Sequence, residues 1–76
     1  MKKKIAIFGS TGSIGKSLID IIDHDKDNFE IILLTTNKNY SNLLKQAKIF
    51  KVKNLIITDK KSYNIARKKK LKINIY

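Results

Sequence analysis

Three glycines at a spacing of three lie in the segment 9–15, between an apolar run at residues 5–8 and a predicted helix. A strand that turns sharply into a helix needs backbone angles that side chains disfavour, and a diphosphate packed on that turn leaves no room for a Cβ atom. The helix would present unpaired N–H groups and the positive end of its dipole to phosphate oxygens. The spacing and its context therefore predict a site for the diphosphate of a nucleotide.

Each residue of this loop has an expected role. Gly9 would form the turn, Gly12 would allow close approach of the ligand, and Gly15 would let the helix pack tightly on the sheet. The hydroxyl groups of Ser10, Thr11 and Ser13 would add hydrogen-bond donors. The alternative is an ordinary turn and helix cap, because Ser, Thr and Gly are favoured there in any case.

The sequence misses the motif of a Walker-type phosphate loop by one position. That motif needs a glycine, four further residues and then Gly-Lys-Ser or Gly-Lys-Thr. Gly15, Lys16 and Ser17 supply the ending, but the first glycine would have to stand at position 10, which is Ser10. Lys16 is therefore expected on the helix, beyond the loop.

Apolar patterning predicts strands that alternate with helices. The runs at 3–8 and 29–36 predict strands buried on both faces, 55–58 predicts a third strand, and Ile73 and Ile75 hint at a fourth. Strands alternating with helices require parallel pairing through right-handed crossovers. We expect an α/β fold in one domain, residues 1–76: a Rossmann-like parallel sheet of order βαβαβα(β), which is an incomplete dinucleotide-binding domain.

Three helices are predicted between the strands. The first, at about 12–24, would bury a stripe formed by Ile14, Leu18, Ile21 and Ile22. The second would be capped by Ser41 and bury Leu43, Leu44, Ala47 and Phe50. The third, at 61–70, would follow a cap at Asp59 and end in the basic run 67–70.

Composition narrows the function classes. The chain has 76 residues, no cysteine and a formal charge of +11, with one arginine among its 17 basic residues. Without cysteine there is no disulfide or thiolate metal site. No apolar stretch approaches the roughly 20 residues that span a bilayer, so we expect a cytoplasmic protein without a membrane partner. Scattered lysines and aromatics indicate a general compositional bias, and a nucleic-acid partner is not expected.

The residues after the second predicted strand bear on the choice of cofactor. An acidic residue about 20 positions beyond the glycines binds the ribose of NAD, whereas a cation there accommodates the 2′-phosphate of NADP. Residues 35–39 contain no carboxylate; Lys38 offers a positive charge, and Asn37 and Asn39 offer amide donors. The pattern favours NADP; the alternative is an asparagine-rich turn with an incidental lysine.

The segment 4–15 closely resembles the N-terminus of 1-deoxy-D-xylulose 5-phosphate reductoisomerases, in which a GSTGSIG loop opens the NADPH domain. The connection at 25–29, the loop Asn37–Asn39, and Gln46-Ala47 with Phe50 also resemble that family. The resemblance covers nearly the whole chain and weakens after about residue 64. It implies that Thr11, Gly12, Ser13 and Ile14 contact the diphosphate and adenosine side of NADPH. It further implies that Asn37, Lys38 and Asn39 contact the 2′-phosphate and ribose.

By the same resemblance, this chain is the N-terminal part of an NADP-binding domain, and a fragment that is inactive alone. The family's enzymes are several times longer, and their Mg²⁺ or Mn²⁺ ligands and phosphosugar site lie in regions without a counterpart here, as do the catalytic and C-terminal domains. The parent reaction would convert 1-deoxy-D-xylulose 5-phosphate to 2-C-methyl-D-erythritol 4-phosphate, with NADPH as reductant, in the non-mevalonate route to isoprenoids. The parent would be a homodimer. Many members carry glycine where this chain has Asn37, which tolerates left-handed backbone angles.

The residues themselves provide no catalytic group. His24 is expected at the surface, and Asp23, Asp25 and Asp27 lack the glycine and glutamate that complete a calcium loop. Two other functions stay open at this point. One is the NADP-binding segment of another reductase, of the extended short-chain or semialdehyde dehydrogenase type. The other is a non-catalytic basic module that binds nucleotides or nucleic acid.

Overall fold

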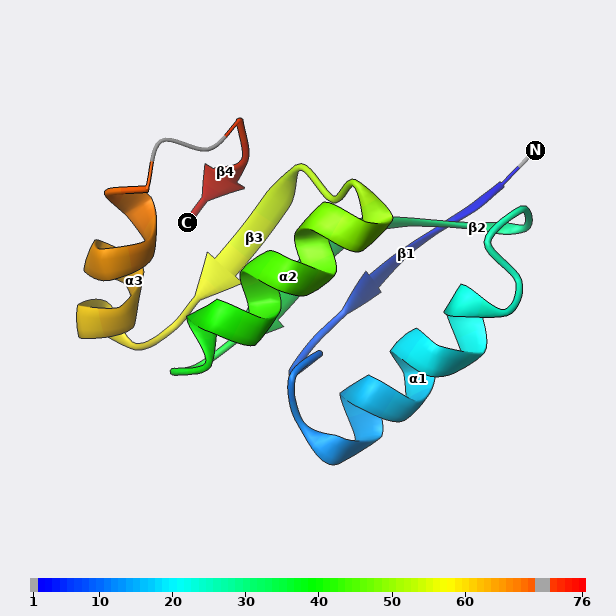
Figure 1. Ribbon diagram of the computed structural model, residues 1–76, viewed down its shortest axis with the longest axis horizontal. Helices are drawn as coiled ribbons and strands as arrows, with labels where there is room; N and C mark the ends of the chain where they lie inside the picture. The colour runs from blue at the N-terminus through cyan, green and yellow to red at the C-terminus, as the bar shows by residue number, and fades with distance from the viewer. Residues whose placement is uncertain (1, 70–71) are drawn as a thin grey trace.

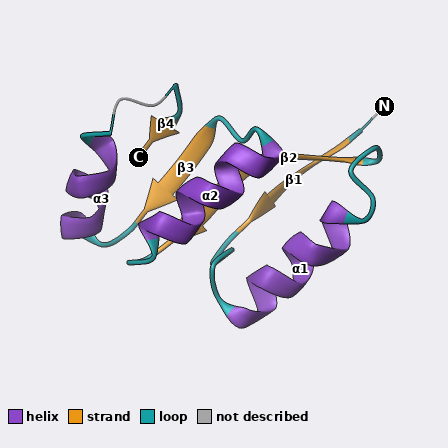
Figure 2. Cartoon of the chain, viewed as in Figure 1, coloured by secondary structure: helices purple, strands orange, loops and turns teal. Residues whose placement is uncertain are grey.

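The computed structural model describes residues 2–69 and 72–76, and within these ranges four strands alternate with three helices (Figures 1 and 2). The elements are β1 (Lys3–Ile7), α1 (Ser13–Asp23), β2 (Phe29–Thr36), α2 (Tyr40–Phe50), β3 (Asn54–Ile57), α3 (Lys60–Arg67) and β4 (Asn74–Ile75). The predicted order βαβαβα(β), including the fourth strand, is confirmed. Among the described residues, no helix has the length and apolarity needed to cross a membrane.

The strands form one parallel sheet in the order β1-β2-β3-β4. β1 pairs with β2 from Lys3 opposite Phe29 to Ile7 opposite Leu34, with an irregularity between Ile5 and Ala6. Within the described chain, β1 and β4 therefore form the two edges of the sheet.

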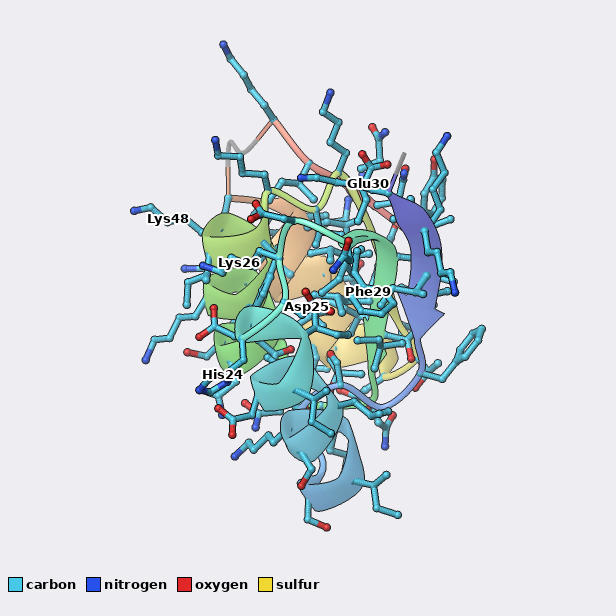
Figure 3. All side chains as sticks on the ribbon, turned by 90° about the vertical axis from the view of Figure 1, so that its right-hand side faces the viewer. His24, Asp25, Lys26, Phe29, Glu30 and Lys48 are labelled. Atoms are coloured by element: carbon cyan, nitrogen blue, oxygen red, sulfur yellow. The ribbon has the colours of Figure 1, made fainter. Side chains whose placement is uncertain are left out.

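The helices all cover the same face of the sheet. Each crossover is expected to be right-handed and moves on to the next strand in the same direction, which places successive helices on one side. Figure 3 shows this two-layer arrangement edge-on, and the shortest extent of the molecule is only 15 Å. The core lies between the layers, where Leu34 of β2, Leu43 of α2 and Leu55 of β3 are fully buried.

The prediction that the first two strands are buried on both faces is wrong. Ile7 and Ile31 are buried, but Ala6 and Ile32 are exposed, and so is Phe8 directly after β1. The apolar runs are those of a doubly covered sheet. Among the residues that the structure describes, helices lie on one face of the sheet only, so side chains such as Ile32 on the other face meet solvent.

The buried stripe predicted for the first helix is also wrong in three of its four positions. Ile22 is buried, but Ile14, Leu18 and Ile21 are 79%, 45% and 64% exposed. The helix buries Gly15 and Ile22 instead and half-buries Ile19. Two apolar stripes therefore run along α1, and within the described residues the one with Gly15 and Ile22 is the more deeply buried.

The predicted apolar stripe of the second helix is confirmed, but its predicted cap is not. α2 begins at Tyr40 with Asn39 as its N-cap, because the Asn39 side-chain oxygen accepts the Asn42 N–H at 3.4 Å, so the predicted cap at Ser41 is wrong. The stripe of Leu43, Leu44, Ala47 and Phe50 does belong to the core side.

The third helix begins where it was predicted to begin, because Asp59 caps α3. α3 ends at Arg67, and the predicted extension to Lys70 reaches outside the described residues.

His24 forms the C-cap of α1, where its ring nitrogen Nδ1 lies 2.8 Å from the Asp20 carbonyl oxygen. This hydrogen bond, followed by the negative charges of Asp20 and Asp23, raises the pKa of His24 above its ordinary value of 6.5. A cation is favoured at a helix C-terminus for the same electrostatic reason.

We therefore expect an NMR titration of His24 to show a midpoint above that of the unfolded chain. Because the folded pKa is the higher one, the stabilisation is complete below pH 6.5 and is lost as the pH rises through the folded pKa. Asp20→Asn removes one charge but keeps the carbonyl, so part of the upward shift should survive. A midpoint at or below the unfolded value would contradict this account of the helix end.

Candidate functional site

The glycine loop connects the carboxyl end of β1 to the first turn of α1 (Figure 1). Ligands of open parallel sheets bind at this edge, where the strands end in loops. Gly9 has φ +68°, and an added Cβ would meet nothing within 4 Å. Glycine is therefore needed at position 9 for its backbone conformation and not for space, in agreement with the predicted turn.

Gly15 is needed for space. An added Cβ would lie 2.6 Å from the Ser10 Cα atom and would overlap the carbonyl oxygen of Gly9. Both neighbours are backbone atoms and cannot rotate away. The first turn of α1 thus packs directly on the loop that precedes it, whereas the sequence predicted a close contact between this glycine and the sheet.

Two threonines at the end of β2 hold the loop in place. The Gly9 N–H donates to the Thr35 hydroxyl oxygen at 2.9 Å, and the Ser10 N–H donates to the Thr35 carbonyl at 3.0 Å. The hydroxyl groups of Thr11 and Thr36 share a hydrogen bond of 2.7 Å. These threonines stand in the sequence as the polar end of an apolar run, and that polarity is the one signal of their role.

The Ser10 side chain does not face the expected ligand. It is 0% exposed, and its hydroxyl donates to the Thr35 carbonyl at 3.4 Å. The expectation that this hydroxyl offers a donor to a phosphate is therefore wrong for this conformation. From the other side, Gln46 of α2 donates its Nε2 hydrogen to the Ser10 carbonyl at 2.9 Å. The sequence did not predict this contact between Gln46 and the glycine loop.

The N-terminus of α1 is open to a ligand. Gly12 is its N-cap and provides no side-chain acceptor, and the first turn contains no acidic residue. Ser13 and Ile14 are exposed there. The other two described helices are capped by the side chains of Asn39 and Asp59. An anion is the natural acceptor for the uncapped N–H groups of α1.

The loop Asn37–Asn39 follows β2 at the same edge of the sheet, and all of its residues are exposed. The Thr58 hydroxyl donates to the Asn37 side-chain oxygen at 2.9 Å, and the Asp59 N–H donates to the Asn37 carbonyl at 3.1 Å. This second loop is thereby fixed to the end of β3. Lys38 is exposed at its centre, while the Asn39 oxygen is occupied in capping α2.

Asp59 places a carboxylate next to this loop, which the sequence around position 38 did not reveal. Hydrogen bonds from the hydroxyl and N–H of Ser62, at 2.7 and 3.0 Å, lower the pKa of Asp59, and the charge of Lys38 contributes to the same shift. The carboxylate is therefore ionised at neutral pH and engaged with α3.

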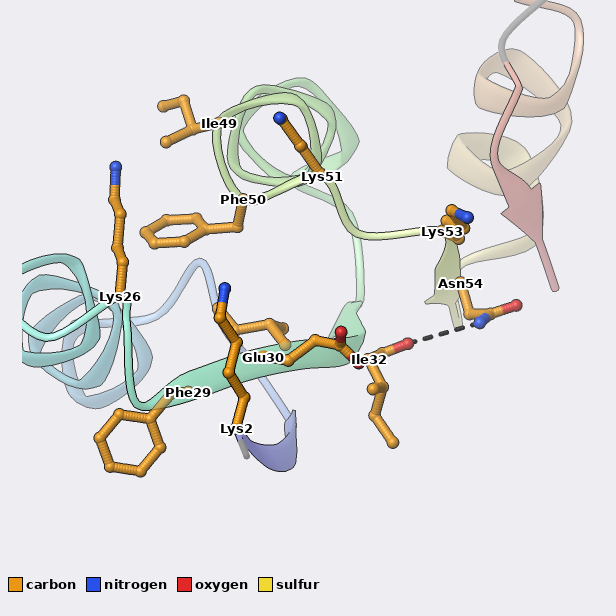
Figure 4. Close-up of a pocket in the computed structure, with 11 residues that line it drawn as sticks. Lys2, Lys26, Phe29, Glu30, Ile32, Ile49, Phe50, Lys51, Lys53 and Asn54 are labelled. Atoms are coloured by element: carbon orange, nitrogen blue, oxygen red, sulfur yellow. Dashed lines mark hydrogen bonds between the residues drawn. The ribbon is translucent and has the colours of Figure 1, made fainter.

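A hollow of the described chain lies at the opposite edge of the sheet, where the strands begin (Figure 4). It encloses about 650 Å³ between the connection that follows α1 and the end of α2, and its lining includes Phe29, Phe50 and four lysines. Lys26 Nζ is 5.5 Å from the centre of the Phe50 ring and pairs with Asp23 at 3.0 Å. Because it borders neither the glycine loop nor Asn37–Asn39, this hollow is separate from the candidate site.

The family of the chain follows from comparison with known proteins. The family described as 1-deoxy-D-xylulose 5-phosphate reductoisomerase matches residues 5–75. The chain belongs to this family. The matched range contains both loops of the candidate site, so the resemblance seen in the sequence is confirmed.

Individual relatives agree with this assignment. The reductoisomerase of Pelagibacter ubique strain HTCC1062 is 58% identical over 97% of this chain and 20% of its own length. That of Buchnera aphidicola from Acyrthosiphon pisum, strain Tuc7, is 46% identical over 88% of this chain and 17% of its own length. The chain therefore spans about a fifth of the length of these curated relatives.

A solved structure shows the same fold. The reductoisomerase from Zymomonas mobilis in complex with NADPH superimposes with a TM-score of 0.90 at 30% identity. The match covers 99% of this chain and 20% of that one. The α/β class with four parallel strands is therefore that of the reductoisomerase family.

Gly15→Ala tests the contact between α1 and the glycine loop. In an isolated helix this change would stabilise by about 1 kcal/mol, because alanine has the higher helix propensity. Here we expect the free energy of unfolding to fall by about 1–3 kcal/mol or more, because the methyl group overlaps backbone atoms. Urea denaturation measures the difference. Gly12→Ser is the control, since its Cβ would stand 3.4 Å from its nearest neighbour; equal stability of the two variants would remove Gly15 from this role.

Proposed function

We propose that this chain is the N-terminal part of the NADPH-binding domain of a 1-deoxy-D-xylulose 5-phosphate reductoisomerase, and that it binds NADPH at the glycine loop and at Asn37–Asn39. The observation that carries the proposal is the close match to the Zymomonas mobilis enzyme, which was solved with NADPH. The match extends over a glycine loop whose geometry requires glycine at Gly9 and Gly15.

The diphosphate of NADPH would bind at the first turn of α1. The uncapped N–H groups there need an acceptor, and backbone donors together with the helix dipole favour phosphate oxygens. Residues 11–14 surround this position, and Gly9 and Gly15 shape it. The hydroxyl and the N–H of Ser10 are both used inside the protein, so Ser10 would support the loop without donating to the diphosphate.

The 2′-phosphate would bind at the second loop. Lys38 is exposed at its centre, and the Asn37 and Asn39 side chains retain amide hydrogens after their oxygens have accepted other bonds. A lysine acts here as a point charge toward the phosphate. The loop is held by Thr58 and Asp59, so little ordering is needed on binding.

The other steps of the family's reaction would depend on parts of the longer relatives. No group of three or more metal-ligating side chains occurs in the described part of the chain, and these residues do not fit a Mg²⁺ or Mn²⁺ site. We propose that the metal, the phosphosugar substrate and the homodimer contacts belong to the four-fifths of the relatives' length that this chain does not span.

Lys38→Ala tests the cofactor preference. A hydrogen bond to a charged group contributes about 1.5–3 kcal/mol, so we expect the Kd for NADPH to rise at least about 10-fold while the Kd for NADH stays unchanged. Calorimetric titration of both cofactors measures this. Lys48→Ala is the matched control, because it removes the same charge from the exposed last turn of α2. Equal affinities of the unaltered chain for NADPH and NADH would refute the assignment.

Gly12→Asp tests the position of the diphosphate. Aspartate is a favourable N-cap residue, so the stability of the fold should not fall. A negative charge against the phosphates should nevertheless weaken NADPH binding by roughly 100-fold or more, since the anion site depends on uncapped N–H groups. Gly12→Ser adds a side chain without charge and should lose less affinity. If Gly12→Asp binds NADPH as tightly as the unaltered chain, the first turn of α1 is not the site.

A further inference from the structure

Four lysines surround the hollow at the edge of the sheet where the strands begin, and the proposed function uses none of them (Figure 4). Lys2 precedes β1, and Lys26 lies in the connection between α1 and β2. Lys51 and Lys53 lie in the connection between α2 and β3. The fold thus brings together charges from three separate segments, and we call the space that these four lysines line the basic hollow.

Positive charge exceeds negative charge in the basic hollow. Glu30 is the one carboxylate among its lining residues, against four ammonium groups. Lys26 pairs with Asp23 at 3.0 Å, but within the described chain the other three lysines of the hollow make no ion pair. All four lysines are exposed. An anion that entered the hollow would therefore meet ammonium groups that no carboxylate already neutralises.

Lys51 adopts a backbone conformation that favours glycine. Its φ is +56° and its ψ +41°, and it is the one described residue other than glycine with a positive φ. The Val52 N–H bonds to the Ala47 carbonyl at 2.9 Å, a pattern of helix ends in which glycine usually holds the left-handed position. A side chain in this conformation costs free energy. Lysine here loses stability and places an ammonium group at the hollow, which is typical of a functional position.

The basic hollow also has an apolar wall. Ile49 and Phe50, at the end of α2, contribute to its lining, and Ile49 is exposed. The Lys26 ammonium group lies 5.5 Å from the centre of the Phe50 ring, so charge and apolar surface stand next to each other. A volume of about 650 Å³ is ordinary for a pocket that holds a small organic ligand. This combination fits a ligand with an anionic group and an apolar part.

We propose that the basic hollow binds a small organic phosphate, whose phosphate group contacts Lys2 and Lys51 and whose apolar part lies against Ile49 and Phe50. Lysine binds phosphate as a point charge. The glycine loop and the loop Asn37–Asn39 lie at the other ends of the strands, so this site is separate from the proposed NADPH contacts. Either assignment can therefore fail without the other.

The test titrates the isotope-labelled chain with naphthyl phosphate and, separately, with inorganic phosphate, and follows the backbone amide signals by NMR. We expect naphthyl phosphate to shift the signals of residues 49–53 and to bind at least about 10-fold more tightly than inorganic phosphate, because its rings bury apolar surface. Saturating NADPH should leave these shifts in place. Equal affinities for the two probes, or shifts spread over lysines of the whole chain, would overturn the proposal, because a formal charge of +11 attracts anions without a site.

Lys51→Gly removes one ammonium group without endangering the fold. Glycine favours the left-handed conformation, so the midpoint of urea unfolding should rise. The Kd for naphthyl phosphate should nevertheless increase at least about 5-fold, as expected for a lost bond to a charged group. Lys48→Ala is the matched control, because it removes the same charge from the last turn of α2, outside the lining of the hollow. Equal Kd values of the two variants would contradict the proposal.

A second measurement places the chain in a complete enzyme. The chain replaces the matching part of the full-length Pelagibacter ubique relative, and the same two substitutions are introduced into the chimera. Lys51→Gly should again weaken the binding of naphthyl phosphate, Lys48→Ala should not, and the Kd for NADPH should stay the same in both. A chimera that no longer binds naphthyl phosphate would also overturn the proposal, because the remainder of the polypeptide would then fill the hollow.

Discussion

The backbone contact between Gly15 and the residues Gly9 and Ser10 is the constraint on which the candidate site depends. It allows α1 to begin immediately above the turn that leaves β1, so that the uncapped N–H groups of α1 stand at the carboxyl ends of the strands. Thr35 fixes the same turn to β2 through two hydrogen bonds of 2.9 and 3.0 Å. The turn is thus held by both α1 and β2 in the absence of a ligand, so binding of an anion requires little rearrangement of the backbone.

The position of this turn also explains why the fold is one-sided. α1 must start above the turn, and α2 starts after the loop that follows β2. Because crossovers between parallel strands are expected to have the same hand, successive helices lie on one face of the sheet. The core between the layers is buried, while the other face and the outer flank of α1 expose apolar residues such as Phe8 and Ile21. Surfaces of this kind suit a segment that belongs to a larger enzyme, and the chain spans about a fifth of its curated relatives.

Local patterns in the sequence predicted the order of elements, the parallel sheet and the glycine turn, because each depends on residues close together in the chain. Periodicity also identified the apolar stripe of α1, but periodicity says only that Ile14, Leu18 and Ile21 share a flank, not that anything covers it. The role of Thr35 and the use of the Ser10 hydroxyl depend on pairing between β1 and β2. Such contacts between residues about 25 positions apart leave no local signal beyond polarity.

Asp59 shows how tertiary structure changes an argument about the cofactor. The lack of a carboxylate in residues 35–39 favoured NADP, yet the Asp59 N–H bonds to the Asn37 carbonyl, which brings an acidic residue to the same loop. Its carboxylate is engaged with Ser62, and hydrogen bonding by Ser62 lowers its pKa, so it remains charged and committed to capping α3. A carboxylate so occupied has less capacity to accept bonds from a ribose. The proposed preference for a 2′-phosphate would therefore depend on the exposed ammonium group of Lys38 and not on the absence of acid.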